Sequence, residues 1–250
     1  MEEQAPSAPT ISFTDIVMNV FASPAEAFEG IRTSPTRAST WLIPIIILII
    51  LSSVFTWLIF TNDALKAQVV DAQRVRLEEQ VRSGQITQER ADQAMEGIDR
   101  AGGVFIAFGI IGSVLMISIT FFGAGLIFWL VGKVALKAPA GYGKYLELWG
   151  ATQWIGVLGL VITLLLALSL NSVYASPSGA LAVLAQFNPR DTVHRVLSSL
   201  NIFSLWQVVV AGIGLAKFSG KSMGTGIGYA LGLWVIWVLI SVFLLAGLGM

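Results

Sequence analysis

The chain has 250 residues, of which 55% are hydrophobic and only 12% are charged, and its fifteen basic residues balance its fifteen acidic ones. Soluble domains carry about 25% charged residues, so a mean hydropathy of +0.77 indicates that lipid solvates most of this chain. The balanced charge excludes a chain-wide field for nucleic acid, and the lack of cysteine excludes disulfides and thiolate metal sites. We therefore expect no nucleic-acid partner, no metal and no cofactor.

The N-terminal part of the sequence is predicted to lie outside the hydrocarbon core. Residues 1–12 are polar and hold two prolines, which predicts a disordered tail with no cleaved signal peptide. In residues 13–36, apolar side chains spaced from Phe13 to Phe21 by helical steps predict one short amphipathic helix. The run Ser23-Pro24-Ala25-Glu26 has the pattern of a capped start for a second helix. Both helices are expected in the membrane interface, and a soluble mini-bundle is the alternative.

Five long apolar segments within residues 37–250 predict an all-α polytopic membrane domain with five transmembrane helices. The predicted spans are 41–60, 104–131, 148–170, 202–216 and 226–245. The fourth is the shortest, because fifteen residues cover only about 22 Å of a core roughly 30 Å thick. It crosses only if residues 197–200 continue the helix or the bilayer thins, and otherwise it is re-entrant.

A soluble segment interrupts the membrane domain between the first two spans. Residues 61–102 hold six of the basic and eight of the acidic residues of the chain. Ser83-Gly84 breaks a first helix and Thr87 caps a second one, which predicts a helical hairpin that projects from the membrane. A protein partner is expected to bind through this hairpin or through the N-terminal helices.

The lysines in two short loops set the predicted orientation. Residues 133–144 carry three lysines and residues 217–221 carry two, which places both loops and the N-terminus in the cytoplasm. The hairpin, the long connection 171–200 and the C-terminus are then extracytoplasmic. Within that connection, residues 179–186 are expected to form a short interfacial helix. His194 and its charged neighbours are expected to form a solvated loop.

Small and polar residues that recur at helical spacing mark the candidate site. Small residues let helix backbones approach closely, and amide side chains can bond across such a contact. No charge lies deep in any span, and Glu147 at the start of the third span is expected at the interface. Structural packing and a polar seam for a substrate or lipid headgroup both remain open. The candidate residues are Thr152, Gln153, Gly156, Gly159 and Thr163 of the third span, Gln207 of the fourth, and Gly224, Gly228 and Gly232 of the fifth.

Two patterns that resemble catalytic motifs fail on inspection. Gly220-Lys221-Ser222 ends like a phosphate-binding loop, but that motif needs a glycine where Leu215 stands. His194 has no nucleophile beside it, and one histidine cannot form a histidine-only metal site. We expect no catalytic residue, and therefore no enzyme.

Three features resemble the Yip family, membrane proteins of the Ypt/Rab-interacting type, in its bacterial branch. They are residues 21–32 followed by Trp41-Leu42-Ile43-Pro44, the stretch 200–206 leading to Gly212-Ile213-Gly214-Leu215, and five spans with a loop after the first. The resemblance implies five helices, a cytoplasmic N-terminus and no known enzymatic chemistry. Eukaryotic members carry D-L-Y-G-P before the first span, where this chain has Ser34-Pro35-Thr36-Arg37. A Rab-type GTPase partner therefore does not carry over.

These observations predict a non-enzymatic protein of the bacterial inner membrane with a membrane-organising or adaptor role. The alternative is a lipid or small-molecule transporter that uses a polar seam between spans 2, 3 and 4. The absence of buried charge and of an internal repeat argues against a transporter. The sequence leaves open whether the chain forms a homo-oligomer.

Overall fold

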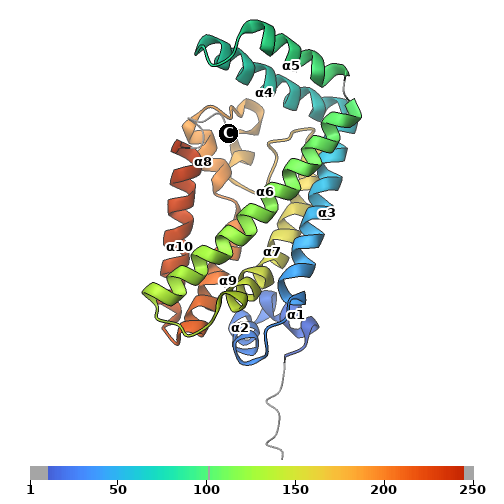
Figure 1. The fold of residues 1–250 in the computed structure, drawn as a ribbon. Helices are drawn as coiled ribbons and strands as arrows, with labels where there is room; N and C mark the ends of the chain where they lie inside the picture. The colour runs from blue at the N-terminus through green and yellow to red at the C-terminus, as the bar shows by residue number, and fades with distance from the viewer. Residues whose placement is uncertain (1–10, 101, 245–250) are drawn as a thin grey trace, which may run out of the picture. The chain divides into compact units, whose positions relative to one another are not determined.

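The computed structural model describes residues 11–100 and 102–244, and these residues form helices and loops with no extended strand. Five of the helices are long and apolar enough to cross a membrane. They are α3, α6 with the turn that follows it, α7, α9, and α10 with the turn that follows it (Figure 1). The predicted all-α fold with five spans is therefore confirmed.

The elements follow one another without long gaps. In chain order they are α1 (Phe13–Ala22), α2 (Pro24–Thr33), α3 (Ser39–Thr61), α4 (Asp63–Arg82), α5 (Gln88–Arg100), α6 (Gly102–Leu130), the π-turn η1 (Val131–Ala135), α7 (Tyr142–Ser169), the 3₁₀ helix η2 (Gly179–Gln186), α8 (Thr192–Ser199), α9 (Ile202–Ser219), α10 (Met223–Leu239) and the π-turn η3 (Ile240–Leu244).

All five spans are longer than the sequence indicates, and the extensions of α7 and α9 bear on the candidate site. Helix α7 begins at Tyr142, six residues before the predicted start, because Lys144 and Glu147 pair with each other inside the helix instead of ending it. Helix α9 has eighteen residues, or about 27 Å at 1.5 Å each, which reaches most of the way across the core. Leu200 has a non-helical backbone, so residues 197–200 do not extend this span.

The charged cluster around His194 was predicted to be a loop and is instead the start of helix α8. Asp191 caps this helix, because its Oδ1 accepts from the backbone N–H groups of Val193 at 2.8 Å and His194 at 3.1 Å. These bonds, that of His194 foremost, hold the pKa of Asp191 below its ordinary value. The interpretation as a solvated loop missed the capping role of the aspartate.

The chain divides into two compact units. Unit 1 contains the described residues of 1–48, 117–159 and 202–239, and unit 2 contains those of 49–116, 160–201 and 240–250. In unit 1, α2 packs on α1 and α9, and α9 packs on α10. Buried side chains of these helices and of α7, such as Phe28, Leu148 and Leu215, form the core.

The N-terminal helices contribute to that core. The apolar face of α1 is buried through Ile16 and Val20, and that of α2 through Ala27, Phe28 and Ile31. Protein atoms, and not lipid, therefore cover these faces. Ser23 stands at the N-cap of α2 and Pro24 at its first position, although the serine side chain makes no capping hydrogen bond.

Unit 2 contains the hairpin of α4 and α5. Gly84 adopts a left-handed φ of 72° at the turn, and the Thr87 hydroxyl accepts from the backbone N–H of Arg90 at 3.3 Å, as the sequence predicts. The Gln68 amide joins α4 to the connection after α7: it donates to the carbonyl of Asn171 at 2.7 Å and accepts from the N–H of Val173 at 3.1 Å. The hairpin is therefore anchored within unit 2.

Candidate functional site

A buried ionic group lies in the first turns of α7 and is the most unusual polar feature of unit 1. The side chain of Glu147 is 2% exposed, and its Oε2 lies 2.6 Å from Nζ of Lys144, one turn earlier on the same helix face. Its Oε1 accepts a hydrogen bond of 2.6 Å from the backbone N–H of Arg37. A buried carboxylate without partners costs several kcal/mol, so both oxygens need these contacts.

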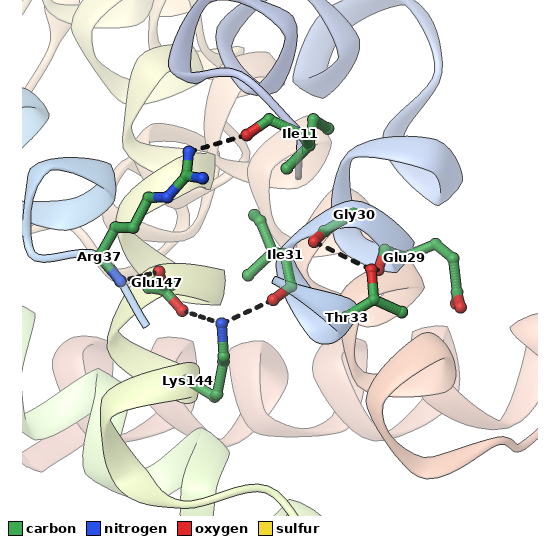
Figure 2. Close-up of polar contacts among 8 residues, drawn as sticks. All are labelled: Ile11, Glu29, Gly30, Ile31, Thr33, Arg37, Lys144 and Glu147. Atoms are coloured by element: carbon green, nitrogen blue, oxygen red, sulfur yellow. Dashed lines mark hydrogen bonds and ion pairs between the residues drawn. The ribbon is translucent and has the colours of Figure 1, made fainter. Parts of the chain in front are cut away.

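The same group reaches the N-terminal helices, as Figure 2 shows. Lys144 Nζ donates to the carbonyl of Ile31 at 2.6 Å, in the last turn of α2. The helix dipole also stabilises a cation at this end of a helix. The Arg37 guanidinium donates to the carbonyl of Ile11 at 2.8 Å, just before α1. We call Arg37, Lys144 and Glu147 the Glu147 network. It ties the start of α7 to both ends of the α1–α2 pair.

The packing around the network makes it rigid. A Cβ added to Gly214 of α9 would lie 2.8 Å from Leu148 Cγ and 3.2 Å from Phe28 Cδ1, closer than side chains tolerate. Phe28, Leu148 and Gly214 therefore bring α2, α7 and α9 together beside the charged groups. Because each charge has a partner, the arrangement holds helices in place.

Four of the predicted seam residues lie together in unit 1. Gln207 Nε2 donates to Thr152 Oγ1 at 3.3 Å, and Thr152 itself donates to the carbonyl of Trp149 at 2.7 Å. Gln153 donates to the same carbonyl at 3.4 Å. A Cβ at Gly156 would lie 3.3 Å from Gln153 Oε1 and 3.7 Å from Gln207 Oε1. The amides and hydroxyl of α7 and α9 therefore bond to one another and to the backbone.

The other predicted seam residues lie elsewhere. Gly159 is close to α9, because an added Cβ would lie 2.8 Å from Phe203 Cβ, whereas Thr163 belongs to unit 2. The Gly224, Gly228 and Gly232 stripe is exposed, and a Cβ at any of the three would meet no atom within 4 Å in the described chain.

The close approach of α9 and α10 uses a different pair of glycines. A Cβ at Gly212 would lie 2.5 Å from Ile227 Cα, and a Cβ at Gly226 would collide with the carbonyl of Gly212. Within this chain, Gly226 and the buried Ala230 form the small-residue face of α10. The sequence contains that spacing too, at i and i+4, but the glycine triplet is more conspicuous.

Sequence reasoning noticed Glu147 but missed its network. The available signal was Lys144 three residues before it, an opposite charge on the same helix face at the edge of an apolar run. Arg37 offered no signal, because its contribution to Glu147 is a backbone N–H that any residue but proline has. Its position beside α7 depends on contacts across 110 residues of chain.

Comparison with known proteins identifies the family of this chain. No solved structure matches the chain. The membrane protein YknW of Bacillus subtilis (strain 168) is 30% identical over 230 residues, which cover 91% of this chain and 88% of that protein. The Yip1 domain family model matches residues 18–245, from α1 through all five spans. This integral membrane protein therefore belongs to the Yip1 domain family.

Proposed function

We propose that this protein is a non-enzymatic membrane adaptor whose α1–α2 pair is a fixed docking platform for a protein partner. The observation that carries the proposal is the Glu147 network. Hydrogen bonds of 2.6 to 2.8 Å, made around a buried ion pair within α7, hold two short helices against the rest of unit 1. Ten-residue helices are marginal alone in water, so this attachment supplies the order that a binding surface needs.

The side of α1 opposite the core supports the same role. Met18 is 65% exposed, and Asp15, one turn earlier, is exposed beside it. An apolar side chain flanked by an acid suits a partner segment that carries both apolar and basic residues. With the N-terminus in the cytoplasm, as the lysines of the two short loops predict, α1 would present that surface to cytoplasmic proteins.

The packing of the seam argues against the transport alternative. A substrate path needs polar groups that are directed at the substrate, whereas the amides of Gln153 and Gln207 are bonded to α7. The Thr152 hydroxyl between them donates to a backbone carbonyl. These residues act as a packing contact in the adaptor hypothesis.

Site-specific photocrosslinking in cells tests the proposal. A photoreactive amino acid is placed at Met18, at the exposed hairpin residue Gln85, and at the lipid-facing Leu165 as the control. We expect a discrete protein adduct at Met18, which disappears when Glu147→Ala frees the α1–α2 pair, and none at Leu165. Adducts at Gln85 alone would show that the partner binds to the hairpin and not to α1 and α2. The transport alternative is tested by measuring solute or lipid flux in reconstituted liposomes. Flux that is lost in the Gln207→Leu variant would show that the protein is a transporter and not an adaptor.

A further inference from the structure

We infer that one end of unit 1 is a docking surface for the headgroups of anionic phospholipids. Residues 117–159 and 202–239 of unit 1 carry five lysines and a single acid, Glu147, which pairs with Lys144. Lys217 lines a surface groove together with two acids, Glu26 and Glu29. The remaining three are Lys133, Lys137 and Lys221, which we call the lysine rim. Within the described chain none of the three pairs with an acid.

The contacts of Tyr145 place these lysines at the same end of unit 1. A Cβ at Gly132 of η1 would collide with the Tyr145 ring, and the centre of that ring lies 5.4 Å from the ring of Phe218 near the end of α9. Turn η1 also contacts α9 directly. Figure 1 shows the end of α6 and the turn from α9 to α10 at this same end of unit 1. Lys133 and Lys137 follow α6, and Lys221 stands in that turn.

The backbone at Lys137 is unusual for a residue with a side chain. Its φ of 56° is left-handed, at the position after a helix end where glycine is typical, and the N–H of Ala138 closes the turn on the carbonyl of Gly132 at 2.9 Å. A non-glycine residue there costs about 1–2 kcal/mol. The turn thus holds a cation where glycine would be less strained, and such strain is typical of functional positions.

The apolar neighbours identify a lipid as the ligand, and not a free phosphate. Leu130 and Val134 are 44% and 72% exposed beside the rim, and they match the acyl chains below a headgroup. Lys133 Nζ lies 5.0 Å from the centre of the Trp129 ring, the aromatic type that collects at membrane interfaces. Cations above an exposed apolar surface suit an amphiphile with a negative headgroup. If the lysines served only to interact with the dipoles of the helix ends, lipid binding would not depend on the charge of the headgroup.

Lipid titration of the full-length protein in an uncharged detergent tests this inference. Dioleoyl phosphatidylglycerol is the probe, dioleoyl phosphatidylcholine is the zwitterionic control, and the apparent affinity is read from tryptophan fluorescence and from the shift in Tm. We expect the phosphatidylglycerol to bind and to raise Tm, and the phosphatidylcholine to do neither. Replacing Lys133, Lys137 and Lys221 together by Gln should weaken binding on the order of 100-fold, since each cation near an anionic surface contributes about fivefold. Equal binding of both lipids, or a triple variant that binds like the wild type, would overturn the inference.

A matched variant tests whether position matters or only total charge. Arg76, Arg82 and Arg90 are exposed in the hairpin, and changing all three to Gln removes the same charge from unit 2. We expect this variant to bind phosphatidylglycerol like the wild type. Equal losses in the two triple variants would show a nonspecific charge effect. Glycerol phosphate that raises Tm as much as the lipid does would show a soluble-anion site instead.

Lys137→Gly separates binding from folding in case the triple variant is unstable. Glycine relieves the left-handed strain, so the Tm without lipid should rise while binding of phosphatidylglycerol weakens about fivefold. A higher Tm with unchanged binding would show that Lys137 only terminates the helix, and the rim would lose its central residue.

Discussion

Replacing Glu147 by Ala should destabilise the protein more than any other single loss of charge in unit 1. The variant leaves the Lys144 ammonium, 14% exposed, without its carboxylate, and it leaves the N–H of Arg37 without an acceptor. Removing one partner of a buried pair costs about 3–5 kcal/mol. For a chain of this size, about 2–4 °C per kcal/mol gives a fall in Tm of about 6–20 °C.

Thermal unfolding in dodecyl maltoside, followed by tryptophan fluorescence, measures the change. The control is Glu78→Ala, whose partner Arg82 lies 3.8 Å away on the hairpin surface, where a pair contributes about 1 kcal/mol or less. Limited proteolysis at residues 34–38 reports separately on release of the α1–α2 pair. A Glu147→Ala variant with the Tm and cleavage rate of the control would refute the buried network.

A double-mutant cycle identifies which contact dominates. Glu147→Gln keeps an acceptor for the Arg37 N–H but removes the charge that balances Lys144. Lys144→Met removes the cation, so the double variant has neither charge. We expect the double variant to be more stable than the sum of the single losses predicts, with a coupling energy of about 0.5–3 kcal/mol. Strictly additive losses would show that Lys144 and Glu147 act independently.

The remaining predictions concern packing, topology and the hairpin. Gly212→Leu should abolish stable folding, because its Cβ would lie 2.5 Å from a backbone atom of α10, whereas Gly228→Leu should leave Tm nearly unchanged; equal effects would contradict the packing. In intact cells, an impermeant thiol reagent should label a cysteine at Ser83 and not one at Ala140, and the reverse pattern would invert the topology. The C-terminal probe Gly249, expected outside, lies beyond the described residues. Gln68→Ala should cost about 1 kcal/mol and speed amide hydrogen exchange at Val173, and unchanged exchange would show that the Gln68 bonds contribute little.

The parts of the fold that depend on local sequence could be predicted. Hydropathy indicates the five spans because each helix meets lipid over most of its own length. Gly84 marks the hairpin turn because the left-handed conformation is a property of that residue. The bounds of η2 match the predicted 179–186, and its N-cap, Ser178, directly precedes it in the sequence.

The parts that depend on distant contacts could not be predicted. The start of α7 was missed because charge inside a span is tolerable only when it is paired, and the Arg37 contact of Glu147 comes from another segment. The packing face of α10 depends on which side Gly212 approaches. Two small-residue faces on that helix satisfy the same spacing rule, and only the neighbouring helix selects between them.

The separation of 110 residues between Arg37 and Glu147 has a consequence during synthesis of the chain. At about 5–20 residues per second, a ribosome needs about 6–22 s after making Arg37 before it adds Glu147. The α9 residues that cover Phe28 are translated later still. During that interval no α7 or α9 is present to cover the apolar faces of the newly made α1 and α2. These faces can then be buried only at the bilayer surface. The interfacial position that the sequence predicts for these helices would then be an intermediate of assembly. The helices would leave the interface once α7 and α9 have been inserted.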